Sequence, residues 1–65
     1  MTAYFFDKAD RNSLKTFCKQ VYHRIGVTDE HEINLICHRP VESLRKANYY
    51  IDITETSYIV IEKAY

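Results

Sequence analysis

The feature that most constrains this fold is a run of apolar side chains with helical spacing between Asn12 and Ile25. Apolar residues recur there at i, i+3, i+4, i+7, i+8 and i+11, namely Leu14, Phe17, Cys18, Val21, Tyr22 and Ile25. This spacing predicts one amphipathic helix that must bury a continuous face. Asn12 or Ser13 is the expected N-cap, and Gly26 is expected to end the helix in a left-handed conformation.

The segments around this helix have the composition of strands and of one shorter helix. Residues 2–6 are aromatic and residues 32–39 contain an apolar run that ends at Pro40, so we expect a strand in each. Residues 41–47 follow the proline with helix formers and predict a short helix. Residues 49–54 alternate in polarity and residues 57–64 are β-branched and aromatic, so they predict a hairpin with its turn at Glu55 and Thr56.

These elements define the predicted fold class. A chain of 65 residues is long enough for one domain, residues 1–65, and too short for two. The element order is β-α-β-(short α)-β-β. A strand–helix–strand unit favours a right-handed crossover between parallel strands, and the hairpin adds two antiparallel strands. We therefore predict an α+β fold, a small two-layer sandwich with one main helix packed on a mixed four-stranded sheet.

The cysteines and the apolar runs bear on the compartment. No apolar run approaches the length of a membrane span, and the short run Tyr4–Phe6 ends at Asp7, too early for a signal peptide. We therefore expect a cytoplasmic protein without a membrane partner. Thiols stay reduced in that compartment, so Cys18 and Cys37 are expected to be buried free thiols rather than a disulfide.

The spacing of the histidines and cysteines argues against a metal and against cysteine catalysis. A structural zinc needs four converging ligands, whereas the candidates Cys18, His23, His31, Cys37 and His38 contain no pair with ligand spacing. A buried thiol on an apolar helix face is a poor nucleophile. One glycine cannot make a phosphate-binding loop. We expect no metal, no cofactor and no enzymatic activity.

One enzyme class stays open as an alternative, a small metal-independent ribonuclease of the toxin-like kind. Such an enzyme needs an acid–base pair and cations that stabilise the phosphate charge. His38, Arg39, Arg45, Lys46 and Tyr50 offer these groups.

The charge distribution supplies the clearest binding signal. The chain has no net charge, but residues 11–24 contain basic groups without acids, and residues 29–32 are acidic. The helical spacing i, i+4 aligns four of the basic residues in what we call the basic stripe, with Arg24 beside it: Arg11, Lys15, Lys19 and His23. The stripe is either an ordinary solvated helix face, with the acidic loop folded back nearby, or a surface for an anionic partner.

The tyrosines and the last strand are the second signal. Tyrosine is enriched in binding interfaces, and Tyr50 and Tyr58 on the predicted hairpin are the candidates that we add to the stripe. The run Tyr58–Ile61 is apolar on both faces. It is either the central strand of the sheet, or an edge strand that a second copy or a partner would cover.

The leading functional hypothesis is a small intracellular regulatory module that acts by protein–protein interaction, as phage and mobile-element inhibitors of host factors do. Its predicted partner is a protein with an acidic surface, and its predicted binding residues are Arg11, Lys15, Lys19, His23, Arg24, Tyr50 and Tyr58. The alternative is a nucleic-acid-binding protein that uses the basic helix face. Its affinity would fall steeply with salt. Neutrality and a sequence pI of about 6.8 place nucleic acid second.

Overall fold

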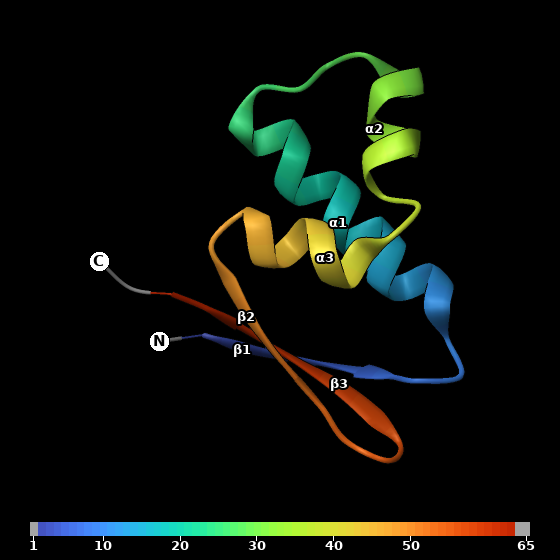
Figure 1. The fold of residues 1–65 in the computed structure, drawn as a ribbon, viewed down its shortest axis with the longest axis vertical. Coiled ribbons are helices and arrows are strands. Elements are labelled where there is room, and N and C mark those ends of the chain that lie inside the picture. The colour runs from blue at the N-terminus through green and yellow to red at the C-terminus, as the bar shows by residue number, and fades with distance from the viewer. Residues whose placement is uncertain (1, 64–65) are drawn as a thin grey trace.

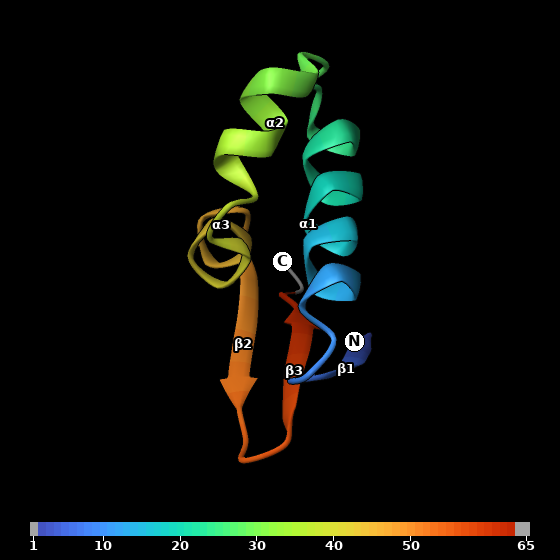
Figure 2. The ribbon, with the colours of Figure 1, turned by 90° about the vertical axis from the view of Figure 1, so that its right-hand side faces the viewer.

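Within residues 2–63, three helices and a three-stranded antiparallel sheet make up the fold (Figure 1). The computed structural model describes residues 2–63. The elements in chain order are β1 (Ala3–Asp7), α1 (Arg11–Ile25), α2 (Glu30–Ile36), α3 (Pro40–Lys46), β2 (Tyr49–Ile53) and β3 (Ser57–Glu62). Seen from the side, α1 stands on one side of the molecule, while α2, α3 and β2 stand on the other (Figure 2). The α+β class is therefore confirmed.

The helix predicted at residues 12–25 is α1. Of the six residues on the predicted face, Leu14, Cys18 and Val21 are buried and Phe17 and Tyr22 are half-buried. Ile25 was expected on the same face but is 60% exposed. Gly26 ends it with φ 115°, where a side chain would be strained. The predicted N-cap was wrong, because Asp10 fills that role and its carboxylate accepts the Ser13 N–H at 3.3 Å and the Ser13 hydroxyl at 2.8 Å.

The strand predicted at residues 32–39 is wrong, since most of this segment forms α2. Asp29 is the N-cap and its carboxylate accepts the His31 N–H at 3.0 Å. Glu30 and Glu32 lie in the first turn, where the helix dipole favours acids. Only Ile33 is fully buried within α2, and Cys37 follows one turn later at the C-cap. A short apolar run with one buried residue per turn does not distinguish a helix from a strand.

The helix predicted at residues 41–47 is α3, which begins at Pro40. Three residues separate α2 from α3, and Figure 1 shows the two helices running in different directions, with α2 above α3, an arrangement similar to a helix–turn–helix. The buried Ser43 hydroxyl donates to the Ile36 carbonyl of α2. The Tyr22 hydroxyl of α1 donates to the Ser43 carbonyl at 2.8 Å. These two bonds tie the three helices together.

The sheet order is β1-β3-β2, and both pairings are antiparallel. The hairpin of β2 and β3 confirms that part of the prediction. The mixed four-stranded sheet and its parallel crossover are wrong: α2 replaces the expected second strand, so residues 2–63 hold three strands and no parallel pair. Because β3 is central, the run Tyr58–Ile61 has a strand on each side and is not an edge.

One side of the sheet faces the helices and carries the core. Ile51, Val60 and Tyr4 are aligned across the three strands on this inner face, and Phe17 of α1 packs on Tyr4 with ring centroids 4.8 Å apart. The next residues along each strand point to the opposite, open face. Phe5 lies there with 72% of its surface exposed.

The two cysteines lie in the same core and are free thiols, as predicted. Burial raises the pKa of the Cys18 thiol, and the neighbouring Cys37 thiol raises it further. Cys18 is therefore a packing residue rather than a nucleophile. None of the helices in residues 2–63 is long and apolar enough to cross a membrane.

Candidate functional site

The two ends of the basic stripe lie near different elements: His23 is close to α2, and Arg11 shares a pocket with α3. Steps of four residues advance by about 40° around a helix, so Arg11 and His23 lie roughly 120° apart on α1. His23 approaches Glu30 of α2, with its Nε2 3.8 Å from the Glu30 carboxylate, and both side chains are exposed. Lys15 and Lys19 are half-buried along the middle of the helix. The acidic segment thus folds back on one end of the stripe only.

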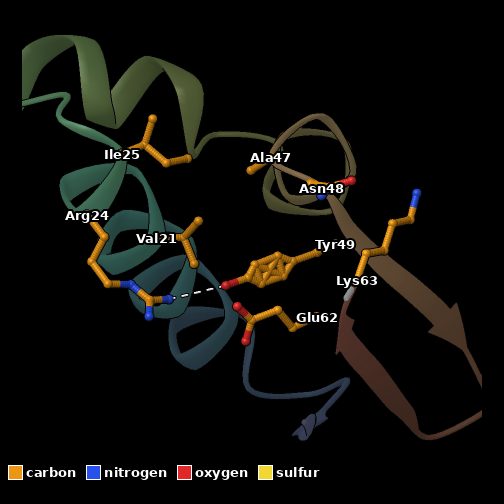
Figure 3. Close-up of a pocket in the computed structure, with 8 residues that line it drawn as sticks. All are labelled: Val21, Arg24, Ile25, Ala47, Asn48, Tyr49, Glu62 and Lys63. Atoms are coloured by element: carbon orange, nitrogen blue, oxygen red, sulfur yellow. Dashed lines mark hydrogen bonds between the residues drawn. The ribbon is translucent and has the colours of Figure 1, made fainter. Parts of the chain in front are cut away.

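Arg24 does not belong to this surface. Its guanidinium Nη2 donates to the Tyr49 hydroxyl at 3.2 Å, in a pocket of about 230 Å³ between α1 and the sheet (Figure 3). Glu62 lines the same pocket. Burial raises the pKa of Tyr49 and the nearby Glu62 raises it further, whereas Arg24 acts in the opposite direction. The hydrogen bond of Arg24 therefore joins α1 to β2, although Arg24 itself stays exposed.

Arg11, at the other end of the stripe, lines a pocket of about 420 Å³ together with α3 and the turn before it. We call it the arginine pocket. Three arginines and one histidine line it, as does a single acid: Arg11, His38, Arg39, Arg45 and Glu42. The remaining lining residues are apolar or aromatic and come from every layer of the fold: Leu14, Pro40, Val41, Ile53 and Tyr58. The pocket is an apolar floor with a cationic rim.

The rim keeps most of its positive charge available. Arg39 reaches Glu42 at 3.9 Å, but both side chains are largely exposed, so this ion pair is weak. Arg45 donates one guanidinium N–H to the Ile51 carbonyl at 3.3 Å, which holds the side chain against the sheet. A guanidinium carries five N–H donors, so the other donors of Arg45 stay open to a ligand. Carboxylate and phosphate are the groups that such arginines bind best.

The two predicted tyrosines lie on opposite faces of the sheet. Tyr58 is half-buried in the wall of the arginine pocket. Tyr50 lies on the open face, where it is aligned with Ile61, and 56% of its surface is exposed. The residues predicted for a ribonuclease are divided in the same way. His38, Arg39 and Arg45 share the pocket, whereas Tyr50 is on the other side of the sheet.

Two residues of the pocket, Arg39 and Arg45, were predicted for the ribonuclease alternative but were not among the binding residues of the leading hypothesis. The sequence held a signal for both, since Arg39 precedes the proline that starts α3, and Arg45 lies in its last turn. Nothing in the spacing, however, connects them to Arg11, because the rest of α1 and the whole of α2 lie between Arg11 and Arg39 in the chain. Only the packing of α3 against α1 brings these arginines to one pocket.

Residues 2–63 contain no cluster of three His, Cys, Asp or Glu side chains that could hold a metal ion. Comparison with protein-family models, with curated proteins and with solved structures found no match.

Proposed function

We propose that this chain is a small protein-binding regulatory module, and that its arginine pocket holds an acidic segment of the partner that also carries apolar side chains. The observation that carries the proposal is the pocket itself, in which Arg11, Arg39 and Arg45 surround a floor of Leu14 and Tyr58. A carboxylate would bind at the rim while a neighbouring apolar side chain fills the floor. The cytoplasmic location and the inhibitor role stay predictions of the sequence.

The surroundings of the pocket favour protein over nucleic acid as the partner. The chain has no net charge, so it lacks the long-range attraction that proteins use to approach a polyanion. The first turn of α2 is acidic, with Glu30 and Glu32. These carboxylates would repel a phosphate backbone that ran along the helix–turn–helix.

Nucleic-acid binding is the second candidate, and the helix–turn–helix of α2 and α3 is the observation that favours it. In DNA-binding proteins with this motif, the second helix enters the major groove. Here the outer face of α3 presents Arg45 and Lys46, and Arg39 lies at its start. Arginine also binds phosphate and guanine well, so the same residues serve both hypotheses.

Fluorescence anisotropy with three labelled probes distinguishes the candidates. The probes are a peptide of alternating glutamate and leucine, its glutamate–serine counterpart, and a duplex oligonucleotide. We expect the glutamate–leucine peptide to bind most tightly, because it alone supplies both a carboxylate and an apolar side chain. Arg11→Glu and Arg39→Glu, made separately, should each weaken its binding about tenfold. Lys19→Glu on the same α1 helix is the matched control and should change binding less than about twofold.

Each other result contradicts part of the proposal. Equal losses in the Lys19 and arginine variants would place the contact on the basic stripe rather than in the pocket. Tighter binding of the duplex, with a steep loss between about 50 and 200 mM salt, would make the protein a nucleic-acid binder instead. No binding by any probe at low salt would remove both candidates.

A further inference from the structure

The outer edge of β1 has unpaired backbone groups. The Lys8 N–H donates to the Thr56 carbonyl at 2.9 Å, and the Glu62 N–H donates to the Thr2 carbonyl at 3.1 Å. Hydrogen bonds to one neighbour alternate along an antiparallel strand, so the even-numbered residues of β1 bond to β3. The N–H groups of Ala3, Phe5 and Asp7 therefore point away from β3, and no strand of residues 2–63 lies beside them.

A groove runs next to this edge on the inner face of the sheet. It has a volume of about 450 Å³ and lies between β1 and one flank of α1. Tyr4, Phe6 and Phe17 provide its aromatic surface, and the Phe6 and Phe17 rings lie 5.4 Å apart between centroids. The flank of α1 contributes only uncharged polar side chains: Asn12, Ser13, Thr16 and Gln20. A strand added to β1 would direct every second side chain into this groove.

We propose that a second copy of this chain occupies this edge, with the two β1 strands antiparallel about a two-fold axis at Phe5. The two sheets would then form one continuous sheet across the dimer. Each Phe5 would lie opposite the other on the open face, as a cross-strand aromatic pair. Tyr4 of each copy would lie opposite Phe6 of the other, and these rings would fill the two grooves.

The groove is lined by aromatic and uncharged polar side chains, and the Tyr4 and Phe6 rings of a second copy would match that lining, while charge decides between registers. With the axis at Phe5, Ala3 lies opposite Asp7 of the other copy, and Thr2 lies opposite Lys8, so no like charges meet. A shift that centres the pairing on Asp7 would place two carboxylates directly opposite each other, which is unfavourable. The lysines of α1 lie on the flank away from the groove, so two uncharged helix flanks approach each other across the axis.

The dimer uses a different part of the molecule from the proposed acidic-segment site, so the two proposals can fail separately. Sedimentation equilibrium of the full chain, from about micromolar to millimolar concentration, should show a reversible monomer–dimer equilibrium. The register predicts opposite effects of two substitutions at one exposed position. Ala3→Lys should tighten the dimer by pairing with Asp7 of the other copy, and Ala3→Glu should weaken it, each by roughly two- to thirtyfold for the two symmetric pairs.

Cross-linking locates the interface independently. A short bismaleimide should join the Phe5→Cys variant into a covalent dimer, because the two positions are adjacent in the proposed pairing. Tyr50→Cys is the matched control, since Tyr50 is exposed on the same open face but on the far edge strand. The two Tyr50 positions would lie at least about 24 Å apart, because five strand spacings separate them across the sheet and they are also offset along the strands, so they should not be joined. The native thiols Cys18 and Cys37 are buried and should not compete.

Hydrogen exchange measured by NMR adds a readout that needs no substitution. The Phe5 amide should become protected as the protein concentration rises, while the Tyr4 amide, which is bonded to β3, should be protected throughout. A chain that stays monomeric at about millimolar concentration would overturn the proposal. A dimer with the same dissociation constant in the Ala3→Lys and Ala3→Glu variants would also overturn it. A covalent dimer formed by the Tyr50→Cys variant and not by the Phe5→Cys variant would do the same. Binding of an extended apolar peptide at β1 by a strictly monomeric chain would show a different occupant and reject the second copy.

Discussion

The two edges of the sheet differ in what covers them. At β2 the helix α3 lies alongside the strand, and Arg45 donates to the outward Ile51 carbonyl at 3.3 Å. At β1 the outward N–H groups of Ala3 and Phe5 have no neighbouring strand among residues 2–63, and the groove beside them is open. An uncovered edge invites pairing with another chain. One short helix, placed directly before β2, thus lies against one edge strand of the sheet and leaves the other edge open.

The largest effect is expected from breaking the packing that holds α3 over β2. Leu44 of α3 is fully buried, so Leu44→Ala should lower the free energy of unfolding by about 2–5 kcal/mol. A core of this size supplies only about 3–5 kcal/mol in total, so the variant should be partly unfolded. Urea denaturation followed by circular dichroism measures the loss. Leu35→Ala, at a position that is 66% exposed, is the control and should change stability by less than about 0.5 kcal/mol.

A smaller change should expose the β2 edge while leaving α3 in place. Arg45→Ala removes the donor to the Ile51 carbonyl and should cost about 1–2 kcal/mol, as hydrogen bonds from charged groups do. It should also make the two edges more alike, so that light scattering detects association beyond the dimer proposed for β1. Lys46→Ala removes the same charge from the next position of α3 and controls for electrostatics. Equal behaviour of the two variants would mean that Arg45 does not protect this edge.

The smallest predicted effect is a pH dependence of stability, and it arises from Cys18 in the core that both edges share. The pKa of Cys18 is raised in the folded state, so the folded thiol keeps its proton where the unfolded thiol loses it, above about pH 8.5. The unfolded state is then favoured as pH rises, and stability should fall by up to about 1 kcal/mol between pH 8.5 and 9.5. Urea denaturation at several pH values in this range measures how steeply the free energy of unfolding falls with pH. Cys18→Ala should flatten this slope, and a slope unchanged in that variant would assign the effect to another group.

How far the sequence predicts the fold depends on how many residues define each element. For α1, six apolar positions in one period, together with a glycine at its end, leave no competing interpretation. For α2, the apolar run is short and suits a strand equally well, and the deciding information is Asp29 with the acids that follow it. Mistaking α2 for a strand also made the sheet mixed and four-stranded. A single ambiguous segment thus changed the topology and not only one element.

The candidate site was less predictable than the fold for a geometric reason. The basic stripe followed from spacing within one helix, and its members Lys15 and Lys19 do share a side of α1. Arg24 is adjacent to His23 in sequence but lies about 100° away around the helix, where it contacts Tyr49 instead. The arginine pocket depends on how α3 crosses α1, and this crossing is set by bonds such as that from Tyr22 to Ser43. Such tertiary contacts leave no local pattern in the sequence.

The register of β1 on β3 has a consequence for the order of events during synthesis. Ala3 pairs with Ile61, so β1 is synthesised well before the strand β3 with which it pairs. During that interval the aromatic run of β1 exposes both of its edges, not one. Closing so long a loop is slow compared with forming the local helices. A nascent chain of this protein is therefore most vulnerable to pairing with its neighbours on the same messenger RNA before β3 becomes available to β1.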